Sequence, residues 1–270
     1  MTDLRDARHA TEAGEPALRE HQAAASVVSA CLAAQARTPR PSRLSRLFGA
    51  SPLNGESRKW YAGAVTELRI AGELAKLGPE WVVLHSVPVG ERGEIVEHLA
   101  IGPAGVFAVG LMHEQGSAVS VQGEQLLVNG AARPHLAVSR DAATEAAVRL
   151  TRASGVNVPV RGLLVAIAPR SLAVLGEPDD VGVTSERGLH KRLATAAGQL
   201  DSSQVAAIVA VASEPSTWHN DVARRRIPVF DPGAFDGLRI DVQRAWVARG
   251  FWGCAVLVAA AITAAQFVAA

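Results

Sequence analysis

The feature that most constrains this chain is its C-terminal stretch, residues 250–270, in which no side chain is charged. As an α-helix, these 21 residues extend about 30 Å, which is the thickness of the hydrocarbon core of a bilayer. Trp246 and Trp252 lie at its start and Phe267 near its end, where interfacial aromatic side chains are common. The many alanines and Gln266 leave a second interpretation open, a helix buried in a soluble core. We favour a transmembrane helix at 250–270.

The basic residues indicate how such a helix is oriented. Arg239, Arg244 and Arg249 lie in the expected juxtamembrane segment at 231–249, and no charged residue follows them in the stretch. By the positive-inside rule, the helix is a single-pass C-terminal anchor and the folded domain is cytosolic. The start of the chain has no apolar core behind a basic head, so it does not resemble a secretory signal.

Composition narrows the class of the rest of the protein. The chain has 270 residues, of which 49% are hydrophobic and 20% charged, and its formal net charge is +1. This balance excludes a wholly disordered chain and a bulk polycation made for nucleic acid. The two cysteines, Cys31 and Cys254, exclude a disulfide scaffold and a multi-cysteine zinc or iron–sulfur site. We therefore expect a globular domain with additional segments.

Two segments precede that domain. Residues 1–36 are rich in alanine and indicate an N-terminal helical segment, whereas residues 37–59 are a basic linker with a single acid, Glu56. A linker of this kind is either a solvated tether or a contact for anionic lipid headgroups or for the phosphates of DNA or RNA. The residues that would make such a contact are Arg37, Arg40, Arg43 and Arg46.

From residue 60 to 230 the sequence predicts one α/β domain. Apolar residues recur at helical spacing over 60–77, and Gly78-Pro79 ends that helix. The continuous apolar run at 160–167 is typical of a strand buried on both faces. Together these elements predict a mixed β-sheet flanked by helices. Short strands are predicted at 81–87, 95–101, 106–111, 119–121, 126–128, 172–175 and 181–183, and further helices at 139–151, 186–198 and 202–212.

Two carboxylates are expected to face the apolar interior of this domain. Glu67 lies between Ala64 and Ala71 on the apolar face of its helix. Glu97 shares a strand face with Ile95, Leu99 and Ile101, while His98 faces the other way with Val96 and Ala100. Inward carboxylates are costly unless they are paired or bind a metal, so the pair is the beginning of a divalent-metal site. The alternative is two partly exposed glutamates near the ends of their elements.

Several motifs resemble a known family. They are W-x-x-G-A-x-x-E at 60–67, W-V-V-L-H-S-V at 81–87 and E-I-V-E-H-L-A-I-G-P-A-G-V-F-A-V at 94–109. V-N-G at 128–130 and Trp218 extend the likeness. The pattern resembles the NERD domain, the nuclease-related domain of the PD-(D/E)XK superfamily. The resemblance implies a restriction-endonuclease-like core and a nuclease that depends on Mg²⁺ or Mn²⁺.

The resemblance also assigns residues to the family's site. The helix glutamate falls on Glu67, and the aspartate of the next motif falls on Glu97, with His98 kept. The third motif, an acid followed two residues later by a lysine, falls on Gly110 and Met112, so both groups are missing. Glu67 and Glu97 alone would hold an ion weakly, and each lost catalytic group of this kind costs about 10²–10⁴-fold in rate.

The leading hypothesis is a membrane-anchored NERD-like pseudoenzyme that is catalytically inactive and serves as a binding or scaffold module. It would bind no cofactor, or Mg²⁺ or Mn²⁺ weakly through Glu67 and Glu97. Contact with DNA or RNA through the basic linker is a further option, and the protein partner is not identified by the sequence. Two alternatives remain, an active Mg²⁺-dependent DNA or RNA nuclease and a protein-interaction module without nucleic-acid contact. His113 and Glu114 are candidates to replace the missing groups.

Overall fold

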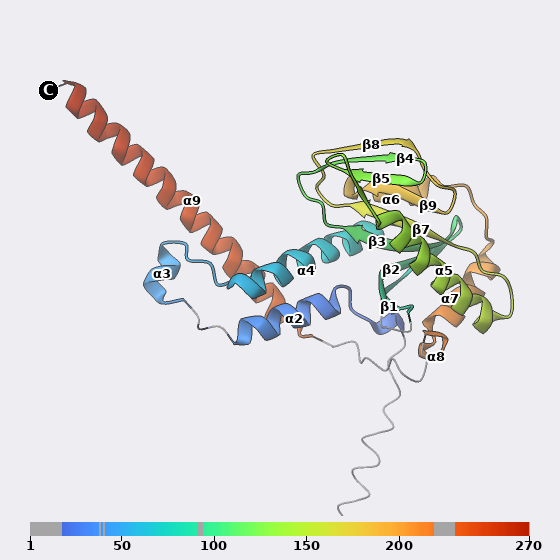
Figure 1. Ribbon diagram of the computed structural model, residues 1–270. Helices are drawn as coiled ribbons and strands as arrows, with labels where there is room; N and C mark the ends of the chain where they lie inside the picture. The colour runs from blue at the N-terminus through green and yellow to red at the C-terminus, as the bar shows by residue number, and fades with distance from the viewer. Residues whose placement is uncertain (1–17, 38, 40, 91–93, 219–229, 270) are drawn as a thin grey trace, which may run out of the picture. The chain divides into compact units, whose positions relative to one another are not determined.

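The computed structural model describes residues 18–37, 39, 41–90, 94–218 and 230–269, with the backbone alone at 267–269. The chain divides into two compact units (Figure 1). Unit 1 comprises residues 1–25 and 66–227, and unit 2 comprises residues 26–65 and 228–270. The expected N-terminal residues 1–17 and Arg40 lie outside the described residues.

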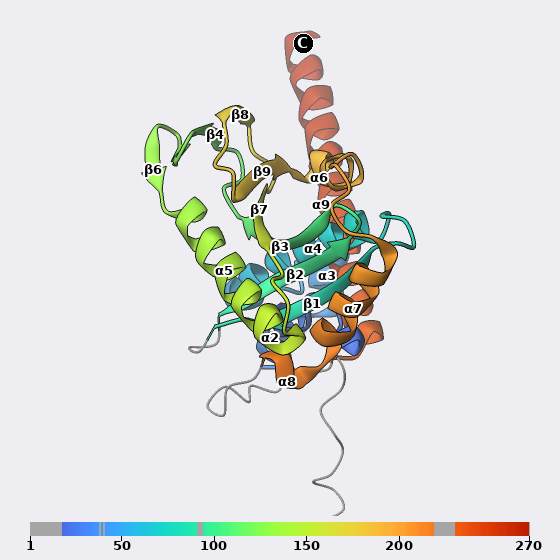
Figure 2. The same cartoon turned by 90° about the vertical axis from the view of Figure 1, so that its right-hand side faces the viewer.

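Unit 1 is built on a five-stranded mixed sheet in the order β1-β2-β3-β7-β9 (Figure 2). The first three strands are antiparallel to one another, and β7 and β9 run parallel to β3. The α/β class and the mixed sheet are confirmed. The strands span β1 Val82–Pro88, β2 Ile95–Gly102, β3 Gly105–Met112, β7 Val160–Ala166 and β9 Val181–Ser185.

Alternating side chains let helices cover both faces of this sheet. Helices α5 (His135–Ser154) and α7 (Ser202–Ser213) pack on the face that includes Leu99 and Ala108. Residues of α4 (Gly55–Leu74) and α6 (Glu186–Ala194) pack on the other face. Because β7 is buried on both sides, its apolar run needs no polar alternation, as the sequence predicted. The short helix α8 (Pro215–Trp218) ends in the buried Trp218.

A second, four-stranded sheet in the order β6-β5-β4-β8 was not expected from the sequence. Three of its strands were predicted from short apolar runs and the exposed strand at 131–133 was not, and the pattern of such runs does not say which sheet each strand joins. The inner face of this sheet packs on the ends of β3 and β7 through residues such as Val121, Leu126 and Met112. Its strands are β4 Ala118–Gln122, β5 Gln125–Val128, β6 Ala131–Arg133 and β8 Ser171–Gly176.

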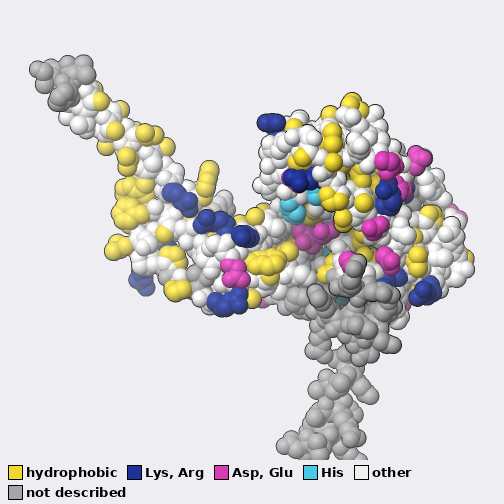
Figure 3. Space-filling model, viewed as in Figure 1, with side chains coloured by type: hydrophobic (Ala, Val, Ile, Leu, Met, Phe, Trp, Pro, Cys, Tyr) yellow, Lys and Arg dark blue, Asp and Glu magenta, His cyan; other side chains and the backbone are white. Residues whose placement is uncertain are grey.

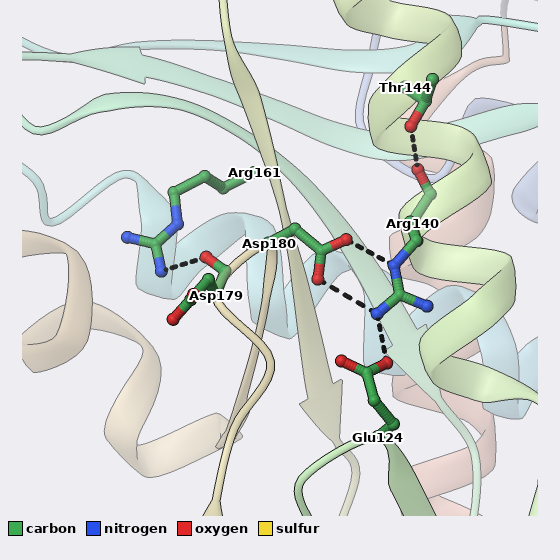
Figure 4. A network of polar contacts seen from close by, with 6 residues as sticks. All are labelled: Glu124, Arg140, Thr144, Arg161, Asp179 and Asp180. Carbon is green, nitrogen blue, oxygen red and sulfur yellow. Dashed lines mark hydrogen bonds and ion pairs between the residues drawn. The ribbon is translucent and has the colours of Figure 1, made fainter.

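A surface network joins α5 to two loops of unit 1 (Figure 4). The Arg140 guanidinium donates to both carboxylate oxygens of Asp180, one of them at 3.1 Å, and to Glu124 Oε2 at 2.7 Å. The hydrogen bonds from Arg140 hold the pKa of Asp180 below its ordinary value. The network therefore links the turn between β4 and β5 to the loop that precedes β9. Nearby, Arg161 donates to the carbonyl of Asp179 at 2.9 Å.

The helices nearest the two ends of the described chain are η1 (Leu18–Glu20), α2 (Ala25–Ala36), α3 (Arg43–Leu47) and α9 (Pro232–Ala269). The segment expected as a linker at 37–59 instead contains α3 and the first residues of α4. The expected juxtamembrane segment and transmembrane helix form one continuous helix, α9. Over 232–266 this helix is long and apolar enough to cross a membrane, with a mean hydropathy of 1.7 in its most apolar window. None of that window is buried, which argues against a core helix of this chain.

Arg149 connects three parts of unit 1 from a buried position on α5. Its Nε donates to the carbonyl of Val89 at 2.5 Å, and its Nη1 donates to the carbonyl of Trp218 at 2.9 Å. We expect Arg149→Met to lower the free energy of unfolding by about 2–4 kcal/mol, because two carbonyls lose a charged donor inside the protein. Urea denaturation of the full chain in detergent measures this. Arg152→Met, on the exposed side of the same helix, should change stability by less than about 0.5 kcal/mol.

Candidate functional site: a buried carboxylate pair

Glu67 lies on α4 with its side chain turned into unit 1, where the residue is 8% exposed. Its Oε1 accepts a hydrogen bond from the backbone N–H of Ala24 at 3.1 Å. Ala24 is fully buried and adopts a left-handed conformation (φ +61°), which is unusual for a residue with a Cβ. Strain of this kind persists only where the surrounding structure imposes it, and here it presents an N–H to a carboxylate.

Glu97 reaches the same region from β2. Its Oε2 lies 3.8 Å from the position that a Cβ on Gly110 would occupy, and Leu164 Cδ2 lies 3.7 Å from that position. The charge of Glu97 also acts on Glu67 and raises the pKa of that carboxyl. Glu97 therefore lies beside Gly110 and close enough to Glu67 for the two charges to interact.

Burial dominates the electrostatics of this pair. Desolvation raises the pKa of Glu67 to about 7, and the negative charge of Glu97 adds to the effect against the Ala24 hydrogen bond. Desolvation likewise raises the pKa of Glu97 to about 7. Near neutral pH both carboxyl groups are therefore still partly protonated, whereas exposed glutamates have already lost their protons.

The backbone of β1 is irregular beside Glu97. The ladder pairs His85 with His98 and Val87 with Val96, and between these pairs Ser86 adopts a positive φ of +53°. The expected placement of Val96 on the face of Ala100 is wrong, because Val96 packs in the same apolar cluster as Leu99. Residues three apart cannot share a face of a regular strand, so the alternation is broken at Glu97. The expected inward position of Ile95 is also wrong, since that residue is exposed.

Two histidines lie next to this irregularity. Their Nδ1 atoms are 2.9 Å apart, so one ring donates to the other across β1 and β2. Burial lowers the pKa of His85 to about 4 and that of His98 to about 3, which keeps both rings neutral. His98 is fully buried, and its Nε2 has no hydrogen-bond partner in the part of the chain that the structure describes. The sequence showed both histidines on adjacent strands, but only the register of the hairpin reveals that they meet.

Met112 stands where the resemblance places a lysine. It is 1% exposed and packs against the inner face of the second sheet with Val121, Leu126 and Leu164. Gly110 and Met112 lie on the same face of β3, opposite Leu164 and Ala166 of β7. The position of the missing base is therefore part of an apolar layer.

The other predicted residues are dispersed. Glu114 faces His135, with 3.3 Å between Oε1 and Nε2, and so contacts α5. Arg37 forms an exposed ion pair with Glu56 at 3.2 Å in unit 2. Arg43 and Arg46 lie on α3 in that unit.

The carboxylate pair meets only part of what a divalent metal needs. Mg²⁺ takes six oxygen ligands in near-octahedral geometry, commonly two carboxylates with water and substrate phosphate. Glu67 and Glu97 supply two side chains, and Gly110 supplies none at the third position. Among the described residues, no group of three or more His, Cys, Asp or Glu side chains is arranged to hold a metal ion.

The chain matches no family model, no curated protein and no solved structure. The resemblance to the NERD domain therefore stays a prediction, which rests on the motifs and on the position of Glu97 beside Gly110.

The pair makes stability depend on pH. Both pKa values are raised above the ordinary 4.5, so the folded state binds more protons and loses stability as pH rises from 4.5 to about 7. Glu67→Gln and Glu97→Gln should each abolish the part of this loss that comes from the replaced carboxyl. Above pH 7 we expect the free energy of unfolding of each variant to be higher than that of the wild type by up to about 3 kcal/mol. Urea unfolding of the full chain across this pH range measures the difference.

The histidines contribute equally to the pH dependence of stability in the wild type and in the variants, so their contributions cancel in the comparison. Glu145→Gln, on the exposed side of α5, is the matched control and should follow the wild-type curve. If the site variants also follow the wild-type curve, the carboxyls are not desolvated and the site is wrong.

Proposed function

We propose that this protein is a membrane-anchored module with a NERD-like, restriction-endonuclease-like core that no longer cuts phosphodiester bonds. It acts as a binding or scaffold module at the cytosolic face of a membrane. The observation that carries this proposal is the position of Glu97, which lies beside Gly110 and close enough to Glu67 for the two charges to interact, so that two acids stand near a position without a side chain.

The geometry supports the loss of chemistry in two ways. With no carboxylate at Gly110, an ion held by Glu67 and Glu97 lacks the third protein ligand that the resemblance implies. Met112 can neither orient an attacking water nor stabilise the charge that develops on a phosphate, because its side chain is apolar and enclosed by other apolar groups. Both losses act on the transition state, so substrate binding can outlast cleavage.

The apolar surface of α9 supports the proposed anchor. Val256, Leu257, Val258 and Ile262 are each more than half exposed, which is unfavourable in water over such a length of helix. A lipid environment removes this cost. The arginines at 239, 244 and 249 precede the apolar part and favour a cytosolic position for the folded units.

A nuclease assay tests the proposed inactivity. We expect the full chain, with Mg²⁺ or Mn²⁺, to cut plasmid, single-stranded DNA and RNA no faster than the double variant Glu67→Gln/Glu97→Gln. Cleavage by the wild type that disappears in the double variant would establish the active-nuclease alternative instead.

The variant Gly110→Asp should increase the affinity for Mn²⁺, measured by calorimetry. A Cβ fits at this position at ordinary contact distances, and the aspartate adds a third carboxylate.

The orientation of α9 can be measured with reporters. We expect alkaline phosphatase, which is active only outside the cytosol, to be active when fused after Ala270 and inactive when fused before Met1. A fluorescent protein that folds only in the cytosol should give the opposite pattern at the two ends. Two ends that both report the cytosol contradict a single-pass anchor.

A further inference from the structure

Unit 2 contains a cavity of about 1020 Å³ between α2, α3 and the first half of α9. Its walls include apolar side chains such as Leu32, Leu47 and Leu238. Three arginines, Arg43, Arg46 and Arg244, line it together with one acid, Asp241. A cavity that combines apolar walls with an excess of arginine suits a ligand with both a negative head and an apolar body.

The arginines remain available for such a ligand. In the described part of the chain, no carboxylate forms an ion pair with Arg43 or Arg46. Arg244 has only a loose contact with Asp241, at 3.9 Å, and its side chain is largely exposed to solvent. Guanidinium groups bind phosphate oxygens through paired N–H donors. These arginines therefore favour a ligand that carries a phosphate over one that is wholly apolar.

Three contacts fix the height of α3 along α9. The Trp252 indole Nε1 donates to the carbonyl of Leu47 at 2.9 Å, and Arg249 Nε donates to the carbonyl of Gly49 at 3.1 Å. The ring of Phe48 lies 4.9 Å from that of Trp252. The C-terminal end of α3 is therefore held where the uncharged part of α9 begins.

Gly49 is needed for this approach. It adopts a φ of +82°, and a Cβ at this position would lie 2.6 Å from the backbone nitrogen of Arg249. Only a residue without a side chain lets the two backbones come so close.

This height places the cavity at the level of lipid headgroups. Arg244 lies six residues before the uncharged stretch, which is about 9 Å along the helix axis, and the polar layer of a bilayer is about 5–8 Å thick on each side. Long arginine side chains span the remaining distance. Around the cavity, Leu44 and Phe48 are 70% and 57% exposed, and Trp246 is also exposed. Figure 3 shows Lys and Arg side chains where the first half of α9 lies among the other helices of this unit, and hydrophobic side chains along the rest of α9.

We propose that α2, α3 and α9 form a binding site for an anionic phospholipid. The lipid phosphate lies among Arg43, Arg46 and Arg244, and its acyl chains follow Leu47 toward the apolar part of α9. This inference rests on the proposed membrane anchor but not on the nuclease-like site. Arg43 and Arg46, for which the sequence left lipid and nucleic acid open, are thereby assigned to lipid, because the contacts of α3 hold them beside the membrane-spanning part of α9.

The test uses the full chain in phosphatidylcholine vesicles that contain phosphatidylglycerol. Bromine on either lipid quenches nearby tryptophan, and Trp246 and Trp252 lie beside the cavity. We expect stronger quenching by brominated phosphatidylglycerol than by an equal fraction of brominated phosphatidylcholine. The difference should correspond to a several-fold enrichment of the anionic lipid near these tryptophans. Each arginine near an anionic surface contributes about fivefold in affinity, and the preference should fall at high salt.

The variant Arg43→Gln/Arg46→Gln/Arg244→Gln should equalise the quenching by the two lipids. Its control, Arg58→Gln/Arg133→Gln/Arg152→Gln, removes the same charge from exposed positions outside the cavity and should keep the preference. Equal quenching in the wild type overturns the lipid site, as does a control that loses the preference. The site is also overturned if the cavity variant keeps its lipid preference and loses only affinity for a DNA oligonucleotide.

Vesicle flotation separates the two proposals. A wild-type chain that floats with vesicles of either composition but shows no lipid preference retains the anchor and loses the lipid site. A chain that floats with neither contradicts the anchor and, with it, the lipid site.

Discussion

The double burial of strand β3 is the constraint on which unit 1 depends. This strand is hydrogen-bonded to β2 on one edge and to β7 on the other, and its side chains enter all three apolar clusters. The buried positions on this strand must therefore fill space without leaving an unpaired polar group. A lysine at 112 needs a bound anion or a carboxylate to offset its desolvation, whereas methionine satisfies the packing alone. The apolar environment of Met112 is a consequence of this constraint.

The two inward carboxylates lower the stability of unit 1 for the same reason, because they are removed from water. Glu67 and Glu97 are both desolvated and their charges interact, and the backbone N–H that donates to Glu67 belongs to Ala24, which has a strained conformation. Packing alone does not call for acids at these two positions, since glutamine fills nearly the same volume. Buried acids without a matching cation are more often found at functional sites than in structural cores. The pair therefore lowers the stability of unit 1 near and above neutral pH, which agrees with the binding role proposed above.

Much of this architecture could be predicted from the sequence, and the failures have physical causes. The apolar run of β7 and the G-P-A-G turn between β2 and β3 identified strands whose partners are local or whose burial is complete. The second sheet was missed because short strands of similar pattern fit either sheet. Broken alternation at Ser86 was missed because a positive φ at serine leaves no trace in hydrophobic periodicity. The contact of Glu67 with Ala24 joins residues 43 positions apart through a backbone group, which no side-chain motif reports.

Helix α3 shows how a basic segment that reads as a linker acquires structure. A helix of five residues is not stable alone, because the entropy lost in forming the first turn exceeds the stabilisation from the few hydrogen bonds of so short a helix. Its stability must come from α9, through Trp252, Arg249 and the close approach at Gly49. Those partners lie at the point where α9 becomes uncharged, so the order of α3 is coupled to the surroundings of that point. A membrane that surrounds the rest of α9 also surrounds the exposed apolar side chains of α3, and the two helices then enter the interface as one element.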